Sequence, residues 1–400
     1  MALPMIHQHS TPESSLIPLL RSHLPYSGPL LRRFQHHVLY PAKTASILAT
    51  FPATSSLSTP SAPWLAAYVD LHSGGTQIWI YSSVEAGVSS PTLQAQSLQS
   101  PGAYQRSKLN LDRATEAQVQ AQLLSLCQYI DTHLLPSYVS SLPATAKEEQ
   151  TSTPSPSGNT LKKLPSVPAN AFLIGSLHTG LDDLLSAAIA EPGKLPPHLP
   201  RIHCPPRDAA VCMKYLFRQT PPPSASGNPG AALPPGYRFH DRIRRGGVQP
   251  YQLDLVISRT HIPRTKHALS KLESVALYYG GGDDSSNVMA DHTHSTNADE
   301  MPIGWVFLNP DGSLCSLHVE EEHRGRGLAA FLAREVMKIG MGEGGTFASG
   351  ISGGEGEGKD EGWAFADVEV NNTASHKVMG KMGGVPGWTV RWVAVGVVKD

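Results

Sequence analysis

The sequence contains no long apolar run. No stretch approaches the roughly 18 consecutive apolar residues that indicate a membrane-spanning helix, so we do not expect a membrane protein. Residues 1–8 also lack the basic segment and the apolar segment of a secretory signal peptide. The sequence therefore favours a cytoplasmic protein with no membrane partner.

Cysteine is also scarce, and the chain has no excess of positive charge. The four cysteines are scattered and form no C-x-x-C pair, which argues against a zinc cluster or a disulfide framework. The chain has 32 Lys and Arg residues against 33 Asp and Glu residues, so its net charge of −1 gives no general reason to bind nucleic acid. Any anion-binding site must therefore be local.

Charged residues make up only 16% of the chain, whereas glycine occurs 36 times and proline 34 times. This composition indicates long, loosely structured connections between packed parts. A chain of 400 residues also exceeds the size at which one hydrophobic core usually stops growing. We therefore expect two domains, residues 1–220 and 236–400, joined by the Pro- and Gly-rich segment 221–235, with residues 137–169 flexible.

Apolar periodicity predicts an α/β pattern for residues 1–220. Helical spacing occurs in four stretches, residues 14–34, 115–136, 181–185 and 209–217. Runs rich in β-branched and aromatic residues occur in three, residues 64–71, 76–81 and 171–175. Gly74 and Gly75 between the first two runs predict a β-hairpin, and Thr115 with Gln118 resembles a helix capping box.

Residues 236–400 alternate between strand-like and helical patterns. Residues 301–319 are typical of two strands around the turn sequence 309–312, and residues 365–370 of another strand. Two Gly-rich segments, 280–300 and 340–362, have no apolar periodicity, and we expect mobile loops there.

One motif in the first Gly-rich segment has a metal-like look. Asp291-His292-Thr293-His294 carries side chains that can bind a metal, but the sequence offers no further ligand for it, so we assign no metal.

The most informative segment is a strand, a glycine turn and a helix in direct succession. Residues 313–319 are typical of a strand, Arg324-Gly325-Arg326-Gly327-Leu328-Ala329 follows, and helical spacing then continues to about residue 338. Glycines let the backbone approach phosphate oxygens, and arginines add charge-assisted donors. The unpaired N–H groups and the dipole of the helix N-terminus suit a pyrophosphate.

Two commoner phosphate loops do not fit this segment, because it has neither a Gly-Lys-Ser/Thr sequence nor a three-glycine dinucleotide fingerprint. A solvated basic turn is the plain alternative. An RNA-binding Gly-Arg motif would need a repeated tract with interleaved aromatic residues, which is absent.

The segment resembles motif A of the GNAT acetyltransferase superfamily, Gln/Arg-x-x-Gly-x-Gly/Ala, through Arg324, Gly327 and Ala329. A second resemblance, to motif B, Asn-x-x-Ser/Ala-x-x-Leu-Tyr-x-Lys-x-Gly-Phe, follows about forty residues on. It is carried by Asn372, Ser375, Val378, Lys381 and Gly383. The match covers residues 236–400 and is closest to the subgroup with glycine N-acyltransferases and FR47-like proteins.

The resemblance implies an α+β fold, in which a C-terminal GNAT-type mixed sheet flanked by helices follows a second, smaller α/β domain with low-complexity inserts. It also implies an N-acyltransferase that moves an acetyl or larger acyl group from acyl-CoA to the amine of a small molecule or amino acid. The implied acyl-CoA site consists of the backbone around Leu317 and Val319, the segment Arg324 to Ala329 with Gly325, Arg326, Gly327 and Leu328, and Asn372 with Ser375.

Three positions depart from the family pattern. Met379 stands where many members have the Tyr that protonates the leaving thiolate, and methionine cannot donate a proton. Gly384 replaces the closing Phe, and Ser313 stands where some members have a general-base Glu. These departures motivate an alternative, a catalytically inactive module that binds acyl-CoA.

His318 and Glu369 are the candidate catalytic residues. A histidine has a pKa suited to taking a proton from an ammonium group near neutral pH. Because strand faces alternate, we expect His318 on the opposite face from Leu317 and Val319. The alternatives are a packed or solvent-facing strand histidine and a solvated carboxylate at the rim of the sheet.

Overall fold

The computed structural model describes most of the chain. The described residues are 4–53, 60, 63–73, 75–87, 106–142, 167–205, 209–218, 232–260, 262, 264–280, 300–342, 344–348 and 362–399. Most of the segments expected to be flexible, and residues 291–294 with their metal-like look, lie outside these ranges.

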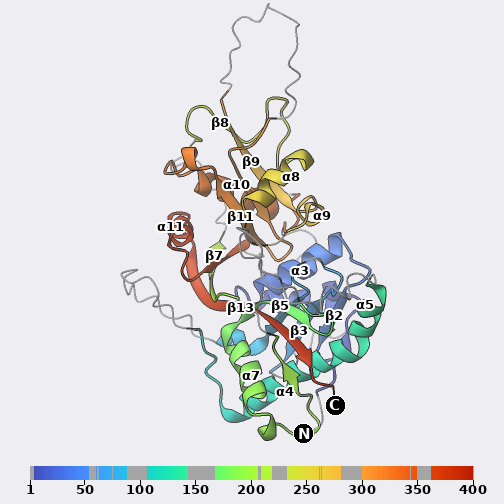
Figure 1. Ribbon diagram of the computed structural model, residues 1–400. Helices are drawn as coiled ribbons and strands as arrows, with labels where there is room; N and C mark the ends of the chain where they lie inside the picture. The colour runs from blue at the N-terminus through green and yellow to red at the C-terminus, as the bar shows by residue number, and fades with distance from the viewer. Residues whose placement is uncertain are drawn as a thin grey trace, which may run out of the picture.

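The strands of the described residues form one large mixed sheet (Figure 1). They are β1 (His7–Gln8), β2 (Ser46–Ala49), β3 (Leu65–Val69), β4 (Ile78–Ser82), β5 (Phe172–His178), β6 (Ile202–His203), β7 (Cys212–Arg218), β8 (Tyr237–Arg238), β9 (Glu273–Tyr279), β10 (Gly304–Leu308), β11 (Ser313–Val319), β12 (Trp363–Glu369) and β13 (Val385–Val397). Their order is β1-β2-β3-β4-β5-β13-β7-β12-β11-β10-β9-β8, with β6 paired to β13.

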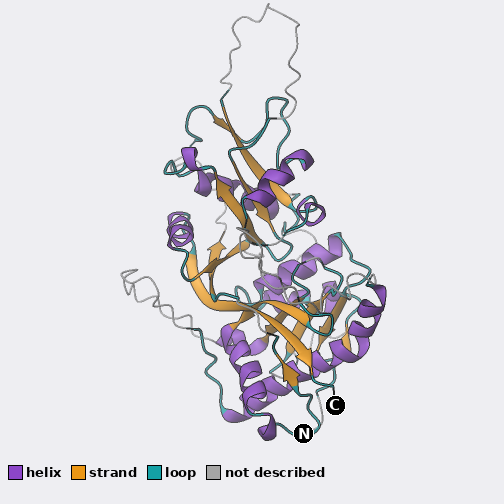
Figure 2. Cartoon of the chain, viewed as in Figure 1, coloured by secondary structure: helices purple, strands orange, loops and turns teal. Residues whose placement is uncertain are grey.

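Helices flank this sheet along its length (Figure 2). They are α1 (Pro12–Ser15), α2 (Ile17–Arg21), α3 (Gly28–Leu39), α4 (Arg113–Tyr129), α5 (Leu135–Ser141), α7 (Thr179–Ala190), α8 (Leu253–Ser258), α9 (Lys266–Leu269), α10 (Leu328–Met341) and α11 (Thr373–Lys381). The expected mixed α and β architecture is therefore confirmed.

The same strand pattern occurs twice. In the N-terminal half, β2, β3 and β4 are antiparallel and β4 is parallel to β5. In the C-terminal half, β9, β10 and β11 are antiparallel and β11 is parallel to β12. The sheet is thus built from two similar regions, and the expected hairpin of β3 and β4 is confirmed.

Each half is completed by a strand from the other part of the sequence. β13, at the end of the sequence, pairs antiparallel with β5 of the N-terminal half, whereas β7 pairs antiparallel with β12 of the C-terminal half. The two exchanged strands also pair with each other at the centre of the sheet. Figure 1 shows β13 in red running from the C-terminal half into the N-terminal half. The boundary at 221–235 stays a prediction, because residues 219–231 lie outside the described part.

The hydrophobic cores follow this exchange. One core of the N-terminal half packs β3, β5, α4 and α7, and it includes Val393 and Val395 from β13. The core under α10 in the C-terminal half includes Met213, Tyr215 and Phe217 from β7. Both halves therefore depend on apolar side chains from distant parts of the sequence.

The helix predicted for residues 209–217 is wrong, because Cys212–Arg218 form strand β7. Cys212 to Phe217 are all buried, because β12 and β13 cover the two edges of the strand and hydrophobic cores cover its two faces. A short apolar run buried on both faces cannot be told from a buried helix by periodicity.

The helix predicted for residues 115–136 differs from expectation at both ends. The N-cap is Asp112, whose carboxylate accepts hydrogen bonds from the N–H groups of Ala114 at 2.9 Å and Thr115 at 2.8 Å, so the capping box at Thr115 is wrong. Pro136 does not end the helix, because it lies in the first turn of α5, where the missing N–H of a proline costs no hydrogen bond within that helix. Residues 137–141 are therefore helical rather than irregular.

His178 predicts how acid destabilises the N-terminal half. Its Nδ1 caps α7 by accepting a hydrogen bond from the N–H of Gly180 at 3.0 Å, and burial lowers the pKa of His178 from 6.5 to about 4. The stability that the neutral ring provides is complete above pH 6.5 and is lost as the pH falls from 6.5 towards 4. His178→Asn keeps a capping oxygen that does not titrate. Urea unfolding at pH 7 and pH 4.5 should show an acid loss about 2–3 kcal/mol smaller in this variant; equal losses would contradict the assignment.

Candidate functional site

The centre of the C-terminal half is a gap between two diverging parallel strands. β11 and β12 are in register only at Ser313 with Phe365 and Leu314 with Ala366. Both strands continue, to Val319 and Glu369, without further pairing between these two described segments. The backbone groups that face the gap are therefore available to a ligand that extends the strand pairing.

A β-bulge bends β11 where the divergence begins. Trp305 of β10 pairs with His318 and Phe307 with Cys315, so Ser316 and Leu317 both lie opposite Val306. Ser316 takes up the extra residue in a left-handed conformation, with φ of 51°. Such a bulge increases the local twist and re-aims the side chains that follow it.

The glycine segment forms an open turn between β11 and α10. Gly325 and Gly327 have φ of 79° and 76°, values that favour glycine because any other L-residue is strained there. A Cβ atom built on either glycine would meet no atom within 4 Å, so the space beside both is open. Gly327 is the N-cap of α10, and in this described part of the chain no side chain caps the helix. The turn therefore leaves backbone N–H groups at the start of α10 without a side-chain acceptor in this described part of the chain. Anion binding there stays a prediction.

α10 is held against the sheet by one apolar face. Leu328, Leu332 and Val336 recur at helical spacing and are at most 2% exposed. They pack in the core with β9, β10 and β11, so the N-terminus of α10 is fixed at the edge where β11 ends. Ala329 lies in the first turn and is half-buried.

The two arginines of the turn have different partners. Arg324 donates from Nε to the carbonyl oxygen of Val319 at 2.9 Å and so ties the turn to the end of β11. Arg326 donates to the hydroxyl oxygen of Tyr237 at 2.5 Å. Both arginines remain exposed, which leaves guanidinium donors on the open side of the turn.

His318 lies on the face of the sheet away from α10. Its ring stacks on Trp305 with centroids 4.6 Å apart, whereas Leu317 and Val319 belong to the core under α10. The expected alternation is therefore confirmed. Burial lowers the pKa of His318 below 6.5, and the nearby Glu320 carboxylate, 3.5 Å from Nε2, opposes part of this change. His318 is thus neutral near pH 7 and able to accept a proton.

Glu369 lies across the gap from His318. Counting on from the Leu314–Ala366 pair, and allowing for the extra residue of the bulge, places the two residues at the same level on the diverging strands. Phe365 belongs to the core on the face away from α10, so strand alternation puts Glu369 on that face as well. The fold thus brings both candidate catalytic residues to one face of the gap.

Asn372 and Ser375 begin the helix that follows β12. Asn372 is the N-cap of α11, and its side-chain oxygen accepts a hydrogen bond from the N–H of Ser375 at 3.0 Å. Met379, on the inner side of this helix, is 4% exposed in the core under α10. The site roles of Asn372 and Ser375 stay predictions.

Sequence reasoning missed two buried polar groups beside the gap. Lys214, only 1% exposed, lies 2.7 Å from the Asp367 carboxylate, which also accepts a hydrogen bond from Ser176 at 2.9 Å. On the other face, the Tyr215 hydroxyl is 2.8 Å from Nδ1 of His376. Both groups depend on β7, so no local motif signals them.

The corresponding helix in the N-terminal half is closed to anions. There the Asp112 carboxylate already accepts the hydrogen bonds of the first N–H groups of α4 and adds negative charge. The anion-binding geometry at a helix N-terminus is therefore found in the C-terminal half.

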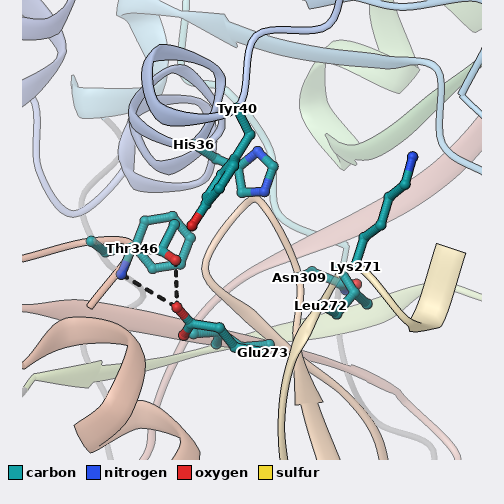
Figure 3. Close-up of a pocket in the computed structure, with 9 residues that line it drawn as sticks. His36, Tyr40, Lys271, Leu272, Glu273, Asn309 and Thr346 are labelled. Atoms are coloured by element: carbon teal, nitrogen blue, oxygen red, sulfur yellow. Dashed lines mark hydrogen bonds between the residues drawn. The ribbon is translucent and has the colours of Figure 1, made fainter. Parts of the chain in front are cut away.

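A small cavity lies beside α3, at the start of β9 and the end of β10 (Figure 3). The glycine turn follows the opposite end of the paired strands β10 and β11. The cavity is lined by side chains that include His36, Tyr40, Glu273 and Thr346, and its volume is about 50 Å³. That volume suits water molecules rather than an acyl chain. The cavity is therefore not part of the candidate site.

Among the described residues, no group of three or more His, Cys, Asp or Glu side chains is placed to hold a metal ion. No helix in the described ranges combines the length and apolar character needed to cross a membrane.

Two family models match the chain. Residues 3–215 match the acyl-CoA N-acyltransferase verG N-terminal domain, and residues 295–349, which include β11 and the glycine turn, match the FR47-like protein family. A search of curated proteins gives no match.

Three solved structures resemble the chain at low identity. A Drosophila protein is 12% identical over 99% of both chains, with a TM-score of 0.46. A tandem GNAT protein from the clavulanic acid biosynthesis pathway is 10% identical over 99% of both chains, with a TM-score of 0.37. A GCN5-related N-acetyltransferase from Kribbella flavida is 10% identical over 84% of this chain and 87% of its own, with a TM-score of 0.35.

Proposed function

Since the chain belongs to the GNAT acetyltransferase superfamily, with a verG-type N-terminal domain and an FR47-like segment, we propose that it is an acyl-CoA-dependent N-acyltransferase. The acceptor is the amine of a small molecule or amino acid. The observation that carries the proposal is the open turn at Gly325 and Gly327, between the diverging strand β11 and the uncapped N-terminus of α10.

The turn would hold the pyrophosphate of acyl-CoA. Backbone N–H groups at the start of α10 and the exposed Arg324 and Arg326 supply donors for its oxygens. The pantetheine arm would pair with the backbone of Leu317 and Val319 along the open edge of β11. The thioester would then lie in the gap between β11 and β12.

Amine attack would occur from the face that carries His318 and Glu369. His318, neutral near pH 7, accepts the proton of the ammonium group, and the free amine then attacks the thioester carbonyl. A backbone N–H in the bulged part of β11 stabilises the negative charge on the carbonyl oxygen. As the carbon–sulfur bond breaks, the attacking nitrogen gives its remaining extra proton to the departing thiolate of CoA or to water, which leaves the neutral amide.

The first experiment is a turnover assay with the purified chain. Acetyl-CoA and longer acyl-CoAs are incubated with a panel of small amines and amino acids, and release of free CoA thiol is followed. Amine-dependent release and the matching amide in the product support the proposal. Acyl-CoA binding without turnover on any amine would favour the alternative, an inactive binding module, which Met379 motivates because a thioether donates no proton.

The pH dependence of turnover tests the role of His318. Glu320, which Arg259 contacts at 3.0 Å, raises the pKa of His318 against the larger lowering by burial. Removing this charge in Glu320→Gln therefore lowers the pKa of His318 further, and the base stays neutral to lower pH. The acid limb of the kcat/KM profile should move to lower pH in this variant. The neighbouring exposed Glu321→Gln serves as control and should leave the limb in place. An unmoved limb in both variants would remove His318 as the base.

A further inference from the structure

A group of three aromatic rings, one exposed and two half-buried, lies beside the glycine turn. Tyr279, at the end of β9, is 49% exposed. Its ring centroid is 4.7 Å from that of Tyr237 and 5.1 Å from that of His323. We call these three residues the aromatic platform. No step of the proposed acyl transfer uses it.

The sheet register places the platform at the correct end of the C-terminal half. Leu277 of β9 pairs with Gly304 of β10, and Gly304 pairs in turn with Val319 of β11. Tyr279, two residues beyond Leu277, therefore lies at the edge where β11 ends and α10 begins. This is the edge at which the turn offers its phosphate donors.

A chain of hydrogen bonds connects the turn to the platform. Arg326 can only donate, so the Tyr237 oxygen accepts its N–H at 2.5 Å, and the Tyr237 hydroxyl can give its own proton to Nδ1 of His323 at 2.9 Å. Arg326 thus reaches from the turn to Tyr237.

The backbone beside Tyr279 holds its ring in position. Gly236 has φ of 83°, and a Cβ on it would lie 3.0 Å from Cε2 of Tyr279, so a larger residue would displace the ring. The N–H of Gly280 donates to the carbonyl oxygen of Gly236 at 3.0 Å and fixes the strand end. The exposed face of the Tyr279 ring is therefore held in a defined position.

We propose that the aromatic platform binds the adenine base of acyl-CoA, with the base stacked on Tyr279. The inference rests on the proposed function, because it needs the pyrophosphate to occupy the turn. A single ribose separates that pyrophosphate from the base, so a base next to Arg326 reaches the platform. Stacking on an exposed aromatic ring stabilises any purine, and the neighbouring guanidinium strengthens it.

The test compares three ligands by calorimetry on the full chain: CoA, dephospho-CoA and 4′-phosphopantetheine. The first two contain adenine, and the third lacks it but keeps a phosphate for the turn. In Tyr279→Ala, the affinities for CoA and dephospho-CoA should fall about tenfold, while that for 4′-phosphopantetheine changes less than about twofold. Tyr279→Phe, which keeps the ring, should bind all three ligands as the wild type does.

A matched control is Tyr40→Ala, which removes an exposed tyrosine, 60% exposed, at the end of α3 and far from the turn, and should change no affinity. An equal loss for all three ligands in Tyr279→Ala would overturn the inference, because Tyr279 would then act through Arg326. Unchanged binding of CoA would overturn it as well. If the wild type binds 4′-phosphopantetheine as tightly as CoA, adenine binding at the aromatic platform is wrong while the proposed function stands. If the wild type binds none of the three ligands, the proposed function is wrong.

Discussion

Gly327→Val is expected to lower the affinity for CoA by at least about 100-fold while the chain stays folded. Two effects combine. A β-branched residue at φ of 76° costs about 1–2 kcal/mol of backbone strain, which the turn can relieve only by changing its shape. The new side chain also fills the open space beside the first N–H groups of α10 and removes charge-assisted hydrogen bonds of about 1.5–3 kcal/mol. A loss of 100-fold corresponds to about 2.7 kcal/mol.

Gly344→Val separates strain from site loss. Gly344 has φ of 79° and equally open surroundings, but it lies past the C-terminus of α10, at the other end of the helix. Gly344→Val should therefore lower the free energy of unfolding by a similar amount and leave the affinity for CoA unchanged. Calorimetric titration of both variants, with circular dichroism to confirm folding, checks the pair. Unchanged CoA affinity in folded Gly327→Val would refute the assignment of the site.

Val395→Asp is expected to destabilise the N-terminal half, although residue 395 is near the end of the sequence. Val395 is 0% exposed and packs in the core formed by β3, β5, α4 and α7. A carboxylate there has no partner, and an unpaired buried charge should lower the free energy of unfolding by about 4 kcal/mol or more. Urea unfolding measures the loss, and hydrogen exchange should show faster exchange in β5 and α7.

Val398→Asp is the matched control for this variant. Val398 is three residues further on and 37% exposed, so its substitution should change the free energy of unfolding by less than about 0.5 kcal/mol. If Val395→Asp accelerated exchange only in α10 and α11 and left β5 protected, the pairing of β13 with β5 would be wrong.

Local pattern was enough to predict the glycine turn. The strand, the turn and α10 are adjacent in sequence, and the positive φ of Gly325 and Gly327 is a property that few other residues tolerate. The hairpin of β3 and β4 and the turn between β10 and β11 were predicted for the same reason, since their partners lie close along the chain.

The exchanged strands could not be predicted in this way. No local signal in Cys212–Arg218 says that its neighbours are β12 and β13, and a doubly buried strand lacks alternation. No strand was predicted for residues 385–397, which form β13. The ion pair of Lys214 with Asp367 was missed with them, because it joins residues 153 positions apart.

The exchange of β7 and β13 has a consequence for synthesis on the ribosome. β5 ends at His178, but the strand that covers its open edge ends at Val397, 219 residues later. At about 5–20 residues per second, the ribosome needs roughly 10–40 s to make that stretch. For that time the nascent N-terminal half exposes an unpaired strand edge and an incomplete core, the kind of surface that chaperones bind and that promotes aggregation. The N-terminal half cannot reach its final sheet until β13 has been made.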